Sequence, residues 1–153
     1  MFRTAGMSGT AVAAVCTIAA IILAPAMPAG AFTNVKQGDT MPAFSLEDTD
    51  GAAVSSGDMG GKVAVIAFFR EGPSTAKALK RINRSFEANK DKAVGYYGIY
   101  LGKGGADAAK ALGGEGGAAF PVLVGTEEVY AAFGVKALPT TAFFDKDGKL
   151  VHF

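Results

Sequence analysis

The side chains best placed for chemistry lie in "FFREGPSTAKALK", residues 68–80, where an apolar run ends and a basic helix is predicted to begin. Ser74 and Thr75 bring two hydroxyl groups to the start of that helix. A hydroxyl becomes a nucleophile only beside a general base, and the single histidine, His152, stands near the other end of the chain. The sequence therefore favours a structural role, in which the two hydroxyls cap free N–H groups of the helix.

The other reactive residue types are sparse. The one cysteine, Cys16, lies in an apolar run near the N-terminus, so residues 32–153 contain no thiol for disulfide exchange. Lys77 is either a cation beside a groove or, as we expect, a solvated charge on the helix face. His152 has no second His or Cys at metal-ligand spacing, so we expect neither a metal nor a cofactor. Anion binding by free N–H groups over residues 72–75 is a further alternative.

The beginning of the chain differs in composition from the rest. Residues 11–24 form an apolar run after a segment with one arginine and no acid, and a small-residue sequence, Ala-Gly-Ala, follows. This pattern predicts a secretory signal peptide over residues 1–31 that is cleaved before Phe32. A membrane anchor is the alternative, but the run is shorter than the ~20 residues of a spanning helix. We expect an exported, periplasmic domain over residues 32–153, free of the membrane after cleavage.

The overall composition indicates one globular domain. Half of the 153 residues are hydrophobic and 19% are charged, which suits a chain with a single core. The formal net charge is +1 and the basic residues are spread along the chain, so the electrostatic footprint of a nucleic-acid-binding protein is missing. We expect no nucleic acid among the partners.

Periodicity predicts the first half of the domain. Residues 43–54 alternate apolar and polar side chains around an Asp-Gly pair, which is typical of a β-hairpin. Residues 62–69 form a continuous β-prone run, as in a central strand covered on both faces. Residues 73–89 then change to helical spacing, with Gly72 as N-cap and Pro73 in the first helical position.

The remaining predicted elements are shorter. They are a buried strand over 93–101, a helix over 106–112, an extended segment over 120–125, a helix over 126–134 with Thr126 and Gly134 as caps, and a hairpin over 140–153. The strand over 93–101 carries Tyr96, Tyr97 and Tyr100, which we expect to pack within the sheet.

Together these elements predict the fold class. Strands and helices alternate before an antiparallel hairpin, which favours an α/β fold with a central mixed β-sheet and helices on both of its faces. No predicted helix follows to cover the outer face of the last hairpin. We therefore expect that a C-terminal helix is missing and that the domain over residues 32–153 is C-terminally truncated.

The element order and three local sequences resemble the thioredoxin-like superfamily, in particular exported redoxins of the TlpA and AhpC/TSA-like group. The first, residues 38–69, is similar to that group's Gly-x-x-x-Pro-x-Phe opening, its Asp-Gly hairpin and its Gly-Lys-Val entry into the central strand. The second, "FGVKALPTTAFFDKDGKLV", is similar to the family's cis-proline region, and the third is the helix start after Phe69. The resemblance implies a thioredoxin-like fold and an oxidoreductase ancestry.

The resemblance also implies a binding face. In the family the proline that matches Pro139 is cis, and the residue before it, here Leu138, turns its backbone polar groups outward to pair with an extended segment. An ordinary trans proline is the alternative reading of the sequence. By this resemblance Leu138, Pro139 and Thr140 are the expected binding residues, and an extended protein segment or partner protein is the expected partner.

The chain departs from the family at the redox site. Aligned on the two phenylalanines, the Cys-x-x-Cys motif falls on Pro73, Ser74, Thr75 and Ala76, followed by Lys77, and both cysteines are absent. The spacing of a peroxiredoxin active site fails too. It places the peroxidatic cysteine on Lys77 and the arginine that would lower the pKa of that cysteine on Pro139. Two hypotheses remain open: a redox-inactive binding domain, or an oxidoreductase or peroxiredoxin-like antioxidant that uses cysteines from outside this sequence.

Overall fold

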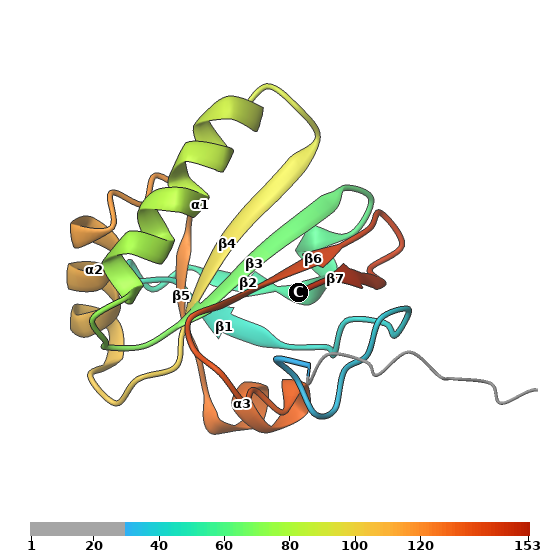
Figure 1. The fold of residues 1–153 in the computed structure, drawn as a ribbon, viewed down its shortest axis with the longest axis horizontal. Helices are drawn as coiled ribbons and strands as arrows, with labels where there is room; N and C mark the ends of the chain where they lie inside the picture. The colour runs from blue at the N-terminus through green and yellow to red at the C-terminus, as the bar shows by residue number, and fades with distance from the viewer. Residues whose placement is uncertain (1–29) are drawn as a thin grey trace, which may run out of the picture.

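The computed structural model describes residues 30–153, so most of the predicted signal peptide, with Cys16, lies outside the described residues. A five-stranded mixed sheet has the order β5-β4-β3-β6-β7 (Figure 1). Its strands are β3 (Val63–Phe69), β4 (Val94–Tyr100), β5 (Val122–Val124), β6 (Thr140–Phe144) and β7 (Leu150–His152). β4 runs parallel to β3 and β5, whereas β6 is antiparallel to β3 and β7. The predicted central strand and C-terminal hairpin are therefore confirmed.

Helices cover both faces of this sheet (Figure 1). Helices α1 (Thr75–Asn89) and α2 (Gly105–Glu115) pack on one face, and α3 (Glu127–Phe133) packs on the other. A two-stranded hairpin, β1 (Ser45–Glu47) and β2 (Ala53–Ser55), and the 3-10 helix η1 (Ser56–Met59) lie on the α3 side. The predicted α/β class and the opening hairpin are confirmed. Between Gly30 and Phe153, no helix is long and apolar enough to cross a membrane.

Strand β3 is apolar at every position because both of its faces are covered. Ala64, Ile66 and Phe68 point into the core under α3, while Val65 and Phe69 point into the core under α1 and α2. Successive side chains of a strand alternate between faces, so only an unbroken apolar run serves two cores. The strand ends at the edge where α1 begins and thereby positions the candidate site.

Helix α3 follows its predicted capping. The Thr126 hydroxyl oxygen accepts a hydrogen bond from the Val129 N–H at 3.3 Å, and Gly134 ends the helix with a φ of 62°. That left-handed conformation suits glycine because a Cβ atom is disfavoured there. The capped helix leads directly into the loop that contains Pro139.

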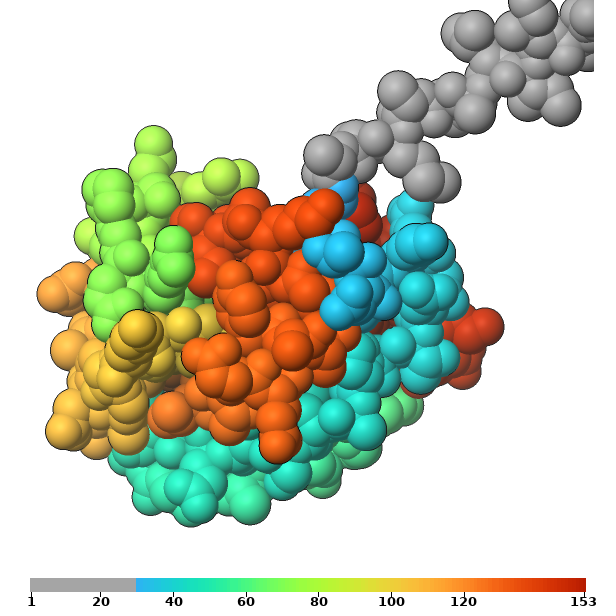
Figure 2. All heavy atoms as spheres, turned by 90° about the horizontal axis from the view of Figure 1, so that it is seen from below, coloured from blue at the N-terminus to red at the C-terminus, as the bar shows by residue number. Residues whose placement is uncertain are grey.

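The first described residues hold the loop that contains Pro139 against the core. Phe32 is 6% exposed, and its ring centroid lies 5.4 Å from that of Phe68 and 5.8 Å from that of Phe153. The Ala31 carbonyl oxygen accepts a hydrogen bond from the Lys136 N–H at 2.8 Å. Figure 2 shows the first described segment, in blue, lying beside α3, in orange. The predicted cleavage point before Phe32 therefore lies next to a residue that is packed in the core.

Candidate functional site

The loop between β3 and α1 holds the positions at which the sequence resemblance expects the redox motif. α1 begins at Thr75, so the predicted start at Pro73, with Gly72 as N-cap, is wrong. Gly72 and Pro73 instead belong to a turn, in which the Thr75 N–H donates to the Gly72 carbonyl oxygen at 3.2 Å. Thr75 is 2% exposed, and its hydroxyl donates to the Arg70 carbonyl oxygen at 2.6 Å. This bond ties the first helical residue to the end of the strand.

The two hydroxyls at this junction do not cap the helix, so that prediction is wrong. Ser74 holds the N-cap position with helical angles (φ −98°, ψ −8°), and its side chain makes no capping hydrogen bond. Side-chain caps normally need an extended backbone at this position. Thr75 donates its hydroxyl proton to a carbonyl oxygen and uses its own N–H in the turn. The Thr75 N–H is therefore not free to bind an anion over residues 72–75.

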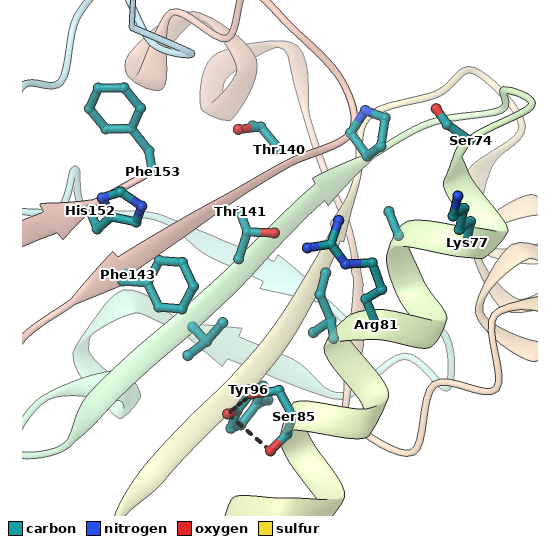
Figure 3. A pocket seen from close by; sticks show the side chains of 14 residues that line it. Ser74, Lys77, Arg81, Ser85, Tyr96, Thr140, Thr141, Phe143, His152 and Phe153 are labelled. Atoms are coloured by element: carbon teal, nitrogen blue, oxygen red, sulfur yellow. Dashed lines mark hydrogen bonds between the residues drawn. The ribbon is translucent and has the colours of Figure 1, made fainter. Parts of the chain in front are cut away.

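A groove with a volume of about 730 Å³ lies between α1 and the sheet. Val65 of β3 and Phe143 of β6 belong to its apolar lining. At one end the hydroxyls of Ser85 and Tyr96 lie 2.7 Å apart (Figure 3). No aspartate or glutamate lines the groove. It is thus an apolar channel with polar and basic edges.

This groove brings together two of the sequence-predicted clusters. Ser74 and Lys77, from the start of α1, line it together with Pro139 and Thr140, from the loop that enters β6. The other predicted site residues, Pro73, Thr75, Ala76 and Leu138, do not line it. Lys77 is exposed, as expected of a solvated charge, and it also lies beside a groove. Lys77 is therefore both a solvated charge on the helix face and a cation beside a groove.

The loop before β6 presents free backbone groups. The Leu138–Pro139 peptide bond is cis. The Leu138 side chain packs against the core on the α3 side, and its N–H and C=O form no hydrogen bond within residues 30–153. Two residues later, Thr140 pairs with Phe68 in the sheet. The backbone N–H and C=O of Leu138 are therefore without a partner among the described residues.

His152 is nearer to the candidate site than its place in the sequence suggests. It lines the same groove as Ser74, because β7 folds back along β6. The two side chains lie at opposite ends of the view in Figure 3, and the His152 ring instead faces Phe143, with centroids 5.8 Å apart. His152 therefore does not sit beside Ser74 as a general base. Over residues 30–153, no group of three or more His, Cys, Asp or Glu side chains could hold a metal ion.

Sequence analysis did not identify a polar contact that lies beside the loop between β3 and α1. The hydroxyl of Tyr100, at the end of β4, donates to the Glu71 carboxylate and accepts a hydrogen bond from the Gly104 N–H at 3.0 Å. The hydrogen bond from Tyr100 lowers the pKa of Glu71, and burial, followed by this same bond, raises the pKa of Tyr100. Because parallel strands end at the same edge of a sheet, the two predicted strands could have indicated that Glu71 and Tyr100 lie close together.

The comparison with protein families agrees with the fold. A family model described as the AhpC/TSA family matches residues 37–153. The chain belongs to the AhpC/TSA family. The matched range includes the opening hairpin, the loop before α1 and the loop through Pro139. No curated protein matches the sequence.

Solved structures share the architecture of this AhpC/TSA-family protein. The thioredoxin domain of a thiol-disulfide oxidoreductase from Bacteroides vulgatus is 23% identical with a TM-score of 0.70, over 76% of this chain and 86% of that one. A thiol:disulfide interchange protein of the thioredoxin family from Chlorobium tepidum is 22% identical with a TM-score of 0.66, over 76% and 85%. A secreted disulfide oxidoreductase from Mycobacterium tuberculosis is 22% identical with a TM-score of 0.63, over 71% and 80%. The fold is thioredoxin-like.

Proposed function

We propose that this AhpC/TSA-family protein is an exported, redox-inactive domain that binds an extended protein segment beside Leu138, Pro139 and Thr140. The observation that carries the proposal is the lack of any cysteine in residues 32–153, on a scaffold that keeps the groove beside Pro139. Pro73 and Ala76 stand where the alignment expects the two sulfur atoms. A proline ring and a methyl group carry out no disulfide exchange, because that reaction needs a thiolate.

The free backbone of Leu138 supports binding of a protein segment. Its N–H and C=O have no partner within residues 30–153, and an extended chain can satisfy both groups by pairing as an added strand. The adjacent groove is apolar in part, with Val65 and Phe143 in its lining. It can therefore take up side chains of the bound segment, which add burial to the backbone pairing.

Export is part of the proposal. The predicted signal peptide precedes Phe32, which is packed in the core. One structure of the same fold belongs to a secreted disulfide oxidoreductase. A periplasmic location would place the domain among unfolded exported chains, which expose extended segments of the kind that it is proposed to bind.

Two activity assays and one binding assay test this function. The exported protein is purified and assayed for reduction of insulin disulfides and for consumption of hydrogen peroxide. We expect no turnover above a control without protein, together with binding of labelled extended peptides by fluorescence anisotropy. Turnover of either substrate would contradict the redox-inactive assignment. A lack of binding to any peptide would contradict the binding role.

The second candidate is thiol-disulfide oxidoreductase or peroxiredoxin-like antioxidant activity, as in the parent family. Membership of the AhpC/TSA family favours it. The cysteines would then come from a partner or from sequence beyond residues 1–153. The discriminating measurement is insulin reduction by the purified protein mixed with an exported fraction from cells that lack its gene. A gain over the sum of the two separate rates would favour this candidate.

A further inference from the structure

One hydrogen bond in the loop before β6 depends on the predicted signal peptide. The Lys136 N–H donates to the Ala31 carbonyl oxygen at 2.8 Å, and it forms no other hydrogen bond among residues 30–153. Ala31 is the last residue of the predicted signal peptide, which is cut before Phe32. That cut removes the carbonyl group, so the Lys136 N–H loses its partner in the mature protein.

The other contacts of this segment survive the cut. The Phe32 and Val35 side chains are 6% and 3% exposed, and the Thr33 N–H donates to the Gly134 carbonyl oxygen at 2.7 Å. These three residues lie on the mature side of the cut. The loop before β6 therefore stays packed against the first segment of the mature chain while one of its N–H donors is released.

The released donor lies beside the proposed binding face. Lys136 precedes Leu138 by two residues, which span at most about 7 Å of chain. The Leu138 N–H and C=O have no partner among the described residues. After the cut, three unpaired backbone groups would therefore lie close together in this loop. In the uncut chain, Ala31 occupies one of them.

We propose that removal of the signal peptide completes the binding face, because the Lys136 N–H then donates to a carbonyl oxygen of the bound segment. This inference rests on the proposed function and adds how its binding face is regulated. An extended chain can place a carbonyl group on this N–H, as Ala31 does where Phe32 and Val135 form an antiparallel bridge. A bound segment that also pairs with Leu138 would take the place of Ala31. An uncut precursor fills that place itself and binds more weakly.

Hydrogen exchange of the Lys136 amide tests the release. The mature protein, which begins at Phe32, is compared by NMR with a form that keeps Ala31 as its first residue. The Lys136 amide should exchange roughly 10-fold faster or more in the mature protein. The Gly38 N–H, which donates to the Leu150 carbonyl oxygen at 2.7 Å, is the internal control and should exchange equally in both forms.

Binding of an unfolded segment tests the pairing. The probe is a fluorescein-labelled insulin B chain whose cysteines are reduced and alkylated. At saturation it should slow the exchange of the Lys136 amide in the mature protein. In fluorescence anisotropy, the mature protein should bind the probe roughly 2- to 10-fold more tightly than the form with Ala31, as expected for one added backbone hydrogen bond.

Acetylation of the Phe32 α-amine in the mature protein provides the matched control. It restores a carbonyl group at the position of the Ala31 carbonyl without adding a residue, and it removes the positive charge that the Ala31 form retains at its first residue. Because both forms carry the carbonyl group, both should protect the Lys136 amide and bind the probe with the lower affinity. A difference between the two forms would assign the effect to charge and overturn the inference.

The remaining outcomes separate this inference from the proposed function. A Lys136 amide that stays fast while the probe is bound, or equal affinities of the mature and Ala31 forms, would overturn the inference and leave the binding role standing. The same holds for faster exchange of the Gly38 amide in the mature protein, or for a first residue other than Phe32 in the exported protein by mass spectrometry. No binding of the probe or of any other labelled peptide would overturn both.

Discussion

The hydroxyl of Tyr100 donates a hydrogen bond to the carboxylate of Glu71 and so joins the end of β4 to the loop that follows β3. Tyr100 is fully buried, and the same hydroxyl accepts the Gly104 N–H at 3.0 Å. The loop that precedes α1 and the loop that precedes α2 are therefore held by one side chain.

Tyr100→Phe removes both hydrogen bonds with little change in packing. We expect the free energy of unfolding to fall by about 1–2 kcal/mol, because Gly104 loses its partner while Glu71 can turn to water. Urea denaturation measures the change. Tyr130→Phe is the control, since Tyr130 is 39% exposed. An equal loss in both variants would argue against the bridging role.

The stability difference between the wild type and Tyr100→Phe should depend on pH. The hydrogen bond from Tyr100 lowers the pKa of Glu71 below its ordinary 4.5. Its contribution is therefore present above that pH and is lost as the pH falls through the lower folded value. Burial raises the pKa of Tyr100 above 10.0, so stability that is present below pH 10 is lost as the pH rises through the folded value.

Urea melts at a series of pH values should therefore give a plateau in this difference between about pH 5 and 9.5, with declines on either side. Asp58 also has a lowered pKa, but it titrates in both proteins and cancels in the difference. A difference that does not change from pH 3 to pH 11 would contradict the assignment.

Thr75→Val tests how α1 is joined to β3. The substitution keeps the branched shape and removes the 2.6 Å hydrogen bond to the Arg70 carbonyl oxygen. We expect a loss of about 1 kcal/mol or more in thermal or urea unfolding, because the carbonyl loses its partner. Ser74→Ala should change little, since the Ser74 hydroxyl makes no capping bond. The opposite ranking would restore the capping role that the sequence suggested.

Two glycines near the end of α2 should respond in opposite ways to alanine. A Cβ on Gly116 would lie 2.3 Å from the Cβ of Leu79 on α1, whereas a Cβ on Gly114 would meet nothing within 4 Å. We expect Gly116→Ala to destabilise by about 1–3 kcal/mol through overpacking. Gly114→Ala should stabilise by about 0.5–1 kcal/mol, since alanine is the better helix former. Thermal melts of both variants measure the pair.

Pro73→Cys with Ala76→Cys tests the assigned positions of the missing sulfurs. Pro73 lies in the turn before α1 and Ala76 in the first turn of that helix. We expect the double variant to form a reversible disulfide, seen by thiol titration, and to reduce insulin above the unmodified protein. Each single variant should stay inactive. An inactive double variant with two free thiols would show that the assigned positions are wrong.

The sequence predicted those parts of the fold whose signals are local. The unbroken apolar run of β3 needs two covered faces, and Thr126 and Gly134 carry their capping roles in their own chemistry. The hairpins follow from Asp-Gly pairs flanked by alternating residues. Each of these patterns lies within a few neighbouring residues, so the structure that it predicts does not depend on tertiary contacts.

The site could be predicted only in part, because its remaining features are tertiary. The start of α1 was misplaced because Thr75 is drawn to a carbonyl at the end of β3. The contact from Tyr100 to Glu71 joins the end of β4 to the loop that follows β3. Arg81 and His152 line the same groove only because β7 folds back along β6. Helical spacing alone gives no indication that Arg81 faces a groove.

The packing of Phe32 has a consequence for the order of events in the export that we propose. The bond that a signal peptidase is predicted to cut, between Ala31 and Phe32, is held between the Lys136 N–H on one side and the buried Phe32 ring on the other. Proteases act on chain segments that have opened away from the fold. Removal of the leader should therefore come first and folding second. A precursor that folds before it is cut would carry its leader for as long as the core around Phe32 stays closed.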